Sequence, residues 1–366
     1  MYINFWYPIC TSSDLEEENP RRVELLGVRL VAFRDESGAT HVLADTCVHR
    51  GGSLSKGKVT GDHLQCPYHG WEFSGDGVCK KIPSMSDKKP PGRAKVDSYP
   101  VQEKYGIVFA FLGDLPEEER PPLHEVAEWE QEGWQFSGPV VFELDAYYER
   151  SIENGMDPVH NEFVHPTQGA PAIDEECFSV VEDDWGCKFF VKFGELTDAD
   201  SHEKVVERGE GELKAGSSHT GPNALITEIH IPGDNSFVQY FYEAPVSANR
   251  TRVFFVHERN NNLDPSSNDW MNKAFMKVAH EDRIIIEHLF PARTPDTLTK
   301  ELMTPGDAAV VKFREHLKRW NGKGWRIDMK TMQDNEGDVA YAIPSPARRE
   351  SGNWVLETVP LLPANN

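Results

Sequence analysis

The sequence lacks a long apolar run. Among its 366 residues, no uninterrupted hydrophobic stretch approaches the ~20 residues that span a bilayer. The first residues, Met-Tyr-Ile-Asn-Phe-Trp-Tyr, also lack the basic stretch with which a secretory signal begins. We therefore expect neither membrane insertion nor secretion.

Cysteine is scarce as well. The six cysteines stand at positions 10, 47, 66, 79, 177 and 187. Their spacing does not match the disulfide frameworks of small secreted proteins. Together with the missing export signal, this pattern predicts a cytoplasmic protein.

Positive charge is in deficit. The chain has 38 Lys and Arg against 60 Asp and Glu, a formal net charge of −22. Such a surface repels phosphates, which argues against a general affinity for nucleic acid. An acidic surface suits a basic protein partner, although solubility alone explains the same number.

Length and composition indicate two globular domains. A chain of 366 residues exceeds one usual compact core, and 39% hydrophobic with 27% charged residues is ordinary globular usage. A Pro- and Glu-rich run at 113–122 precedes a Glu-rich run at 125–132. This change of composition predicts a domain boundary, with one domain over 1–120 and another over 121–366.

The two halves differ in their predicted elements. The first half shows short strands and turns: a hairpin over 23–44 with its turn at 35–38, another turn at 74–77, and a buried strand at 106–112. The second half mixes longer strands with helices, which is typical of an α+β fold. Its predicted elements are strands at 140–148, 178–182, 187–193, 224–231, 236–242 and 251–257, helices at 154–160, 267–289 and 305–320, and a long polar loop at 195–221.

Two short motifs each combine one Cys with one His. They are Cys47-Val-His49 and Cys66-Pro-Tyr-His69. A Rieske-type [2Fe–2S] cluster needs this set, with thiolates on one iron and imidazoles on the other. A Cys₂His₂ zinc site uses the same ligands, but such sites usually pair Cys with Cys and His with His. The mixed loops and their neighbouring glycines therefore favour the cluster.

A second constellation lies between Asn154 and His165, where an Asn, an Asp and two His occur within twelve residues. If a helix runs from Asn154 to His160, Asp157 and His160 lie on one face, and His165 returns toward it before Pro166. Two imidazoles with one carboxylate from elsewhere form the facial triad of non-haem Fe(II) oxygenases. Histidines five apart are also common as surface or capping residues.

In this order, the motifs resemble those of Rieske non-haem iron oxygenases of the α-subunit type, and the resemblance covers most of the chain. Within that family the chain looks closest to the group that includes dicamba O-demethylase, the methylxanthine N-demethylases and vanillate demethylase. The residues that carry the resemblance are Cys47-x-His49, Cys66-x2-His69, Asn154-x2-Asp157-x2-His160-x4-His165, Phe5-Trp-Tyr-Pro8 and Glu281-Asp-Arg-Ile-Ile-Ile-Glu287.

The resemblance implies a fold and a set of site residues. The fold is α+β, with a small all-β Rieske [2Fe–2S] domain before a helix-grip, START-like catalytic domain that holds a mononuclear iron. Cys47, His49, Cys66 and His69 hold the cluster; His160, His165 and Asp282 hold the iron; Asp157 and Asn154 lie beside it. Chemistry alone also permits Glu281, Glu287 or His288 as the third iron ligand, and the resemblance selects Asp282. Asp157 is expected to orient His160 by accepting its ring N–H.

The resemblance also implies the cofactors and partners. A ferredoxin or flavin reductase supplies electrons from NAD(P)H to the cluster, and the mononuclear Fe(II) uses O₂ to oxidise a small organic substrate. The group that the chain resembles implies an aromatic or heterocyclic substrate. In the family, the residue that corresponds to Asp157 links a cluster histidine and an iron histidine across a subunit interface. A head-to-tail ring of this kind closes as a homotrimer.

Several reactions share these ligands. Monooxygenation and O- or N-demethylation are favoured by the group that the chain resembles, and ring cis-dihydroxylation is the alternative. A protein of another class, which transfers electrons through the cluster alone, is disfavoured because the second histidine motif lies in a domain of more than 200 residues. A structural zinc protein would be colourless.

Overall fold

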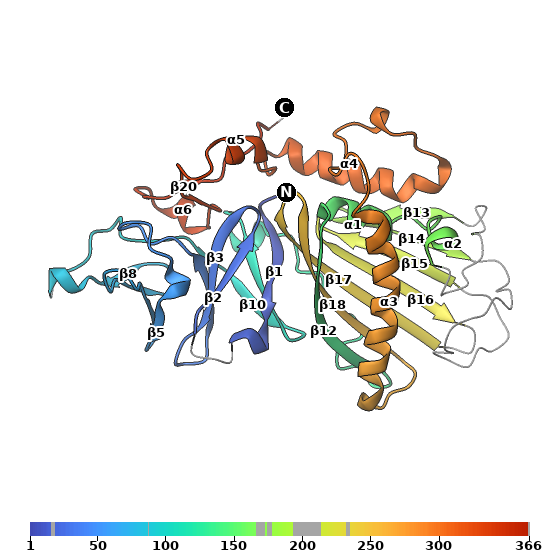
Figure 1. Ribbon diagram of the computed structural model, residues 1–366, viewed down its shortest axis with the longest axis horizontal. Coiled ribbons are helices and arrows are strands. Elements are labelled where there is room, and N and C mark those ends of the chain that lie inside the picture. Colours follow the sequence, from blue (N-terminus) through green and yellow to red (C-terminus); the bar gives the residue numbers. More distant parts are fainter. Residues whose placement is uncertain are drawn as a thin grey trace. The chain divides into compact units, whose positions relative to one another are not determined.

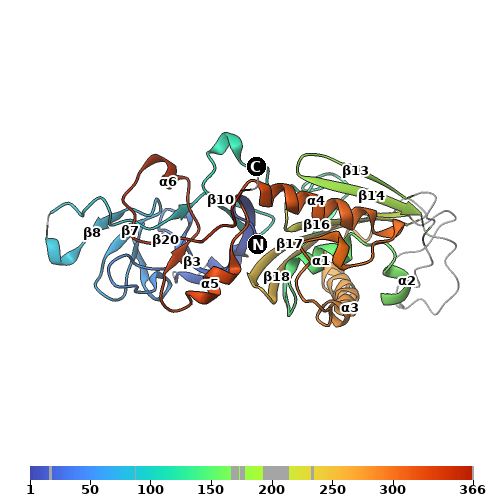
Figure 2. The ribbon, with the colours of Figure 1, turned by 90° about the horizontal axis from the view of Figure 1, so that it is seen from above.

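The computed structural model describes residues 1–15, 19–86, 88–165, 173, 178–192, 214–231 and 235–364. The chain divides into two compact units, which are described separately (Figures 1 and 2). The first contains Met1–Leu123, Pro245–Ser247 and Trp320–Asn366, and the second contains His124–Ala244 and Ala248–Arg319. Among the described residues, no helix is both long and apolar enough to cross a membrane.

The first unit is built from small antiparallel sheets. One has the order β1-β11-β10, a second β2-β3-β4-β9, and a third β5-β6-β7-β8. Their strands are β1 (Phe5–Thr11), β2 (Arg21–Leu25), β3 (Val28–Arg34), β4 (Thr40–Ala44), β5 (Lys58–Thr60), β6 (His63–Gln65), β7 (Glu72–Ser74), β8 (Cys79–Lys81), β9 (Ser98–Tyr99), β10 (Val101–Lys104) and β11 (Ile107–Leu112). Strand β11 is buried at every position, as its apolar run predicts.

The C-terminal segment packs with this first unit, unlike the expectation that it belongs to the second domain. Its elements include α5 (Met329–Asp334), α6 (Ala347–Glu350) and a parallel pair of strands, β19 (Tyr341–Ala342) and β20 (Glu357–Thr358). Two contacts show why. The Ile3 amide donates to the Trp325 carbonyl at 2.9 Å, and the fully buried Asp97 carboxylate binds the Arg348 guanidinium at 2.7 and 2.8 Å. Such long-range pairs leave no periodic signal in the sequence.

The second unit is organised around one seven-stranded sheet with the order β12-β18-β17-β16-β15-β14-β13. Its strands are β12 (Gln135–Leu144), β13 (Ser179–Glu182), β14 (Gly186–Lys192), β15 (Lys214–Thr220), β16 (Ala224–Ile231), β17 (Asn235–Ser247) and β18 (Arg250–Arg259). The long helix α3 (Asn268–Ile286) runs against one face of the sheet (Figure 1). There, the ring of Phe275 meets the rings of Phe237, Phe255 and His257. The predicted α+β class is confirmed.

A predicted strand and a predicted loop of the second unit differ from the structure. The strand predicted at 140–148 is β12, which begins at Gln135 and contains a bulge between Ser137 and Val140; Tyr148 already opens a helix. Part of the loop predicted at 195–221 is strand β15, and residues 195–213 lie outside the described residues. Gly216 and Ser217 have low strand propensity, so the sequence did not indicate this strand. In the structure it is stabilised by pairing with β14 on one side and β16 on the other.

The helix predicted over 154–160 is also absent. Helix α1 (Tyr148–Gly155) ends before Asp157, and a short helix α2 (Asn161–Val164) follows. Pro158 explains the break, because it has no amide hydrogen to donate and disfavours helical backbone at the residue before it. The helix predicted at 305–320 is helix α4 (Ala308–Gly322), preceded by a 3₁₀ turn at Pro305–Asp307. Thr304 and Asp307 cap that turn reciprocally.

Candidate metal centres

In the first unit, two loops of similar construction bring the Cys–His motifs together. In each loop, the cysteine amide donates to the carbonyl five residues ahead, at 2.8 Å for Cys47 to Gly52 and for Cys66 to Trp71. In each, a glycine four residues after the cysteine donates back to the cysteine carbonyl. Gly51 and Gly70 both have φ near +70°, which explains glycine at these positions.

The loops place the thiols inside and the imidazoles outside. Cys47 and Cys66 are each 2% exposed and belong to one apolar cluster. The rings of His49 and His69 are exposed, with centroids 4.5 Å apart. The indole of Trp71 stacks on His49 at 4.7 Å and 6°, which fixes the plane of that imidazole. All four predicted cluster residues therefore lie together.

The donor chemistry of these loops fits a cluster with thiolate ligands. A hydrogen bond from Cys47 lowers the pKa of Cys66 to about 6, and the amides of Tyr68 and His69 also point at the Cys66 sulfur. Amides directed at sulfur stabilise thiolates and tune a bound cluster. A Cβ on Gly52 would lie 3.1 Å from the Cys66 sulfur. Glycine at this position thus leaves space beside the Cys66 sulfur.

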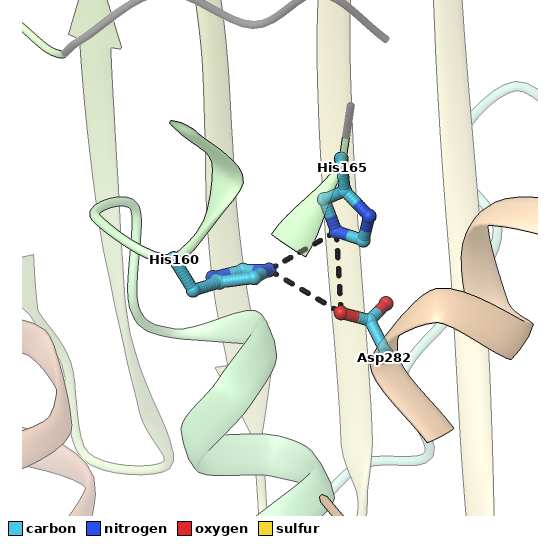
Figure 3. A group of neighbouring side chains, drawn as sticks. All are labelled: His160, His165 and Asp282. Atoms are coloured by element: carbon cyan, nitrogen blue, oxygen red, sulfur yellow. Dashed lines mark hydrogen bonds and ion pairs between the residues drawn. The ribbon is translucent and has the colours of Figure 1, made fainter. Parts of the chain in front are cut away.

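In the second unit, His160, His165 and Asp282 form a compact triangle (Figure 3). The Nε2 atoms of the two histidines are 3.2 Å apart, and Oδ1 of Asp282 lies 3.5 Å from Nε2 of His160 and 3.2 Å from Nε2 of His165. Ligand atoms at about 2.1 Å from a metal, at right angles, are separated by about 3 Å. The spacing of the three donors therefore suits a single ion.

Local contacts fix which nitrogen each imidazole presents. Nδ1 of His160 donates to the main-chain carbonyl of Asp157, and Nδ1 of His165 donates to Oε2 of Glu281 at 3.0 Å. When a ring is neutral and its Nδ1 carries the hydrogen, Nε2 is bare and can bind a metal at the centre of the triangle. That is the protonation state in which imidazole binds a metal. Without a metal, a protonated ring can instead donate from Nε2 to Oδ1 of Asp282.

The carboxylate of Asp282 is held in its charged form. Burial alone raises the pKa of this group, but hydrogen bonds with His160 and His165 outweigh burial and keep the pKa well below its usual range. The Nδ2 amide of Asn154 also donates to Oδ1 of Asp282 at 2.9 Å and lies 3.5 Å from Nε2 of His160. Asn154 thus lies beside both donors.

Two details differ from the expectations or were missed. The partner of the His160 ring is the carbonyl of Asp157, not its carboxylate, which accepts the Val159 amide at 2.8 Å instead. This detail of the predicted role of Asp157 is corrected, because the turn at Pro158 brings the main chain back toward the ring. Sequence reasoning treated Glu281 only as an alternative ligand, whereas it binds the far side of His165. An acidic residue directly beside a ligand was the available signal.

The comparisons with known proteins agree with both centres. Residues 5–100 match the Rieske [2Fe-2S] domain and residues 144–322 match the vanillate O-demethylase oxygenase C-terminal domain. The chain belongs to the Rieske non-haem iron oxygenases, a family of oxidoreductases, as its motifs predicted.

Three relatives represent the matches. Methylxanthine N1-demethylase NdmA of Pseudomonas putida is 28% identical over 86% of this chain and 88% of its own. The solved structure of NdmB from the same organism is 27% identical, with a TM-score of 0.71, over 87% of this chain and 91% of its own. Oxidoreductase NdmD of Pseudomonas putida is 40% identical over 32% of this chain and 20% of its own.

Proposed function

We propose that the chain is a terminal oxygenase that removes a methyl group from, or monooxygenates, a small aromatic or heterocyclic substrate. The observation that carries the proposal is the presence of two different donor sets in one chain, a Cys₂His₂ set in the first unit and a His₂Asp set in the second. Such a pair suits an enzyme that takes up electrons at one centre and uses them at another. Relatives named as demethylases favour demethylation.

In this proposal, Cys47 and Cys66 bind one iron of the cluster, and His49 and His69 bind the other. His160, His165 and Asp282 bind the mononuclear iron. When bound, the two groups supply one-electron transfer and O₂ activation. A three-residue face leaves coordination positions for other ligands.

The protein's own residues prepare and shield the second centre. His165 is 3% exposed, and Asp282 is held charged by its hydrogen bonds. Asn154 keeps the carboxylate oriented toward the two imidazoles. Because these groups are fixed before a metal or substrate arrives, little reorganisation is needed on binding.

An electron-donating protein is part of this proposal. The match to a segment of the oxidoreductase NdmD supports a reductase or ferredoxin that draws on NAD(P)H. We also place the enzyme in the cytoplasm, where thiols remain reduced. The five cysteines that the structure describes are all free, which supports this part of the proposal.

A homotrimer completes the proposal. His69 and Tyr68 are exposed at the edge of the cluster loops, where a second copy can reach them. The second unit exposes Phe290 and Leu302 at 96% and 93%, and large exposed apolar side chains often mark protein contacts. We infer that the carboxylate of Asp157 binds His69 of the partner subunit, while its carbonyl orients His160.

The function is tested by O₂ uptake on a panel of methylxanthines and methoxybenzoates, with a purified reductase as electron source. Demethylation releases formaldehyde in proportion to the O₂ consumed. Formation of a cis-diol without formaldehyde would instead identify a dihydroxylating enzyme. Reduction of the protein with no O₂-dependent product from any substrate would contradict the oxygenase assignment and favour an electron carrier.

The cluster assignment has a matched control within the chain. Cys66→Ser should bleach the visible Rieske spectrum, because it removes a thiolate ligand. Cys79→Ser should keep the spectrum, since Cys79 is equally buried in the same apolar cluster but lies outside the four-residue set. A normal spectrum in Cys66→Ser, or equal bleaching in both variants, contradicts the assignment.

A further inference from the structure

The segment that borders the cluster loops has the opposite charge to the rest of the chain. Residues 80–95 contain six basic residues and one acidic residue, a net charge of +5. Since the whole chain carries −22, the other 350 residues carry −27. The basic residues are Lys80, Lys81, Lys88, Lys89, Arg93 and Lys95.

This basic segment is anchored in the core that holds the two cysteines. Ile82 and Ala94, 3% and 4% exposed, belong to the same apolar cluster as Cys47 and Cys66. The Cys79 amide also donates to the Ala94 carbonyl at 2.9 Å. The loop between these anchors begins after β8 (Figure 1), and its two ends, at Ile82 and Ala94, are fixed to the cysteine core.

The segment also borders the second cluster loop directly. Pro83 lies 3.2 Å from where a Cβ would stand on Gly70, which is the residue after His69. Met85 packs against the apolar cluster that contains Cys66. A protein that covered this segment would thus lie next to a cluster ligand.

Three of the six cations contact described residues of the chain. Lys80 pairs with Asp76, Lys81 with Glu72, and Lys95 donates to Ser351. Within the described part of the chain, no ion pair involves Lys88, Lys89 or Arg93, and all three side chains are exposed. We call these three residues the free basic surface.

We propose that the free basic surface is the docking site of the electron donor, and that the docking face of this donor is acidic. The proposal rests on the proposed function, because it names the partner of the same cluster. It refines the expectation, drawn from the net charge alone, of a basic partner. The charge of the surface near the cluster, rather than the net charge of the chain, determines which face of a partner is oriented toward the cluster.

The electron balance is simple. The donor's reduced [2Fe–2S] cluster loses one electron and the Rieske cluster gains it. No bond forms or breaks and no proton is transferred. Opposite charges on the two faces raise the rate of encounter and orient the two clusters, and salt weakens both effects.

The test measures binding without turnover. A purified, oxidised plant-type [2Fe–2S] ferredoxin of known acidic charge is titrated into the oxidised holoenzyme at about 20 mM and 200 mM salt, since screening over the Debye length should weaken binding at the higher value. We expect K88E/K89E/R93E to weaken binding at least tenfold at low salt and to flatten the salt dependence. The triple variant K300E/K318E/K330E makes the same charge change at exposed residues outside the segment and should change the Kd less than twofold.

A second readout separates docking from damage to the cluster. A neutral, photogenerated deazaflavin radical should reduce wild type and K88E/K89E/R93E at the same rate, while reduction by ferredoxin slows at least tenfold in the variant. Equal ferredoxin binding by both triple variants overturns the proposal, and so does salt-independent binding to the wild type. A change of molecular mass in K88E/K89E/R93E by light scattering also overturns it, because the surface would then join copies of this chain. Failure to oxidise any substrate after chemical reduction refutes the proposed function instead.

Discussion

At the scale of residues, Glu281 contacts a proposed metal ligand from its far side. Glu281 and Asp282 are consecutive on α3, and both reach His165, one at Nδ1 and one at Nε2. The imidazole is therefore held from two sides by carboxylates of one helix. A carboxylate on the far nitrogen raises the basicity of a ligand histidine and fixes its tautomer.

We predict that Glu281→Ala lowers the affinity of the second centre for Fe(II) about 10- to 100-fold. Glu281→Gln should lose less, because its amide oxygen still accepts the Nδ1 hydrogen. Titration of the iron-free protein with Fe(II) or Co(II) measures both effects, and the visible spectrum of the Rieske cluster should stay unchanged.

The matched control is Glu287→Ala. Glu287 directly follows α3 in the sequence. It accepts hydrogen bonds from the Arg283 guanidinium and the Asp145 amide and does not contact a predicted ligand. Its metal affinity should resemble that of the wild type. Equal loss of affinity in Glu281→Ala and Glu287→Ala would mean that Glu281 acts through the helix and not through His165.

At the scale of elements, a buried ion network stabilises the helix that precedes the histidines proposed to bind iron. Arg314 of α4 binds Glu153 of α1 at 2.6 and 2.9 Å and Glu301 at 2.6 Å. Arg150 of α1 binds Glu153 at 3.1 Å and Glu301 at 2.8 Å. The side chains of Arg150, Glu153 and Arg314 are each 8% exposed. Helix α1, which carries Asn154, is thus joined to helix α4 by buried ion pairs.

We predict that Arg314→Met destabilises the protein by about 3–5 kcal/mol, because Arg150 alone is then left to neutralise the two carboxylates of Glu153 and Glu301. Denaturant unfolding followed by circular dichroism measures the loss. Lys312→Met on the same helix removes an exposed pair with Glu315 and should change stability little. If Lys312→Met lowered the free energy of unfolding as much as Arg314→Met does, the loss would come from a general effect on helix α4 and not from the buried ion network.

At the scale of the whole molecule, Asp157 decides between a coupled oligomer and independent subunits. Its carbonyl orients His160, so its carboxylate is not needed for that role. Burial raises the pKa of Asp157, and the nearby carboxylate of Asp307 raises it further. A positively polarised N–H from a partner subunit would offset this cost.

We predict that Asp157→Asn keeps both metal centres occupied but slows single-turnover electron transfer from pre-reduced cluster to iron. An amide offers one acceptor and adds a donor where the partner's imidazole N–H approaches. Glu162→Gln, an exposed change on α2, is the control and should keep the wild-type rate. A wild-type rate in Asp157→Asn would remove the proposed link, and with it the main reason to expect a trimer.

The sequence by itself determined the family, the α+β class and the residues that gather at both centres. Short-range chemistry explains this success. Cys–x–His and Cys–x₂–His fit within single loops, and the two histidines proposed to bind iron lie at the two ends of one short helix. Asp282, 117 residues beyond His165 in number, was selected only by resemblance.

The tertiary structure alone decided the contacts that depend on long-range packing. In the structure, the C-terminal segment belongs to the first unit, and β15 pairs with a strand on each side. Glu281 accepts a hydrogen bond from His165, and the acceptor for the His160 ring is the carbonyl of Asp157 instead of its carboxylate. The physical reason is the same in each case. Hydrophobic periodicity reports which side chains are buried, but a polar pair between distant segments depends on where folding brings each backbone, and no local pattern records that position.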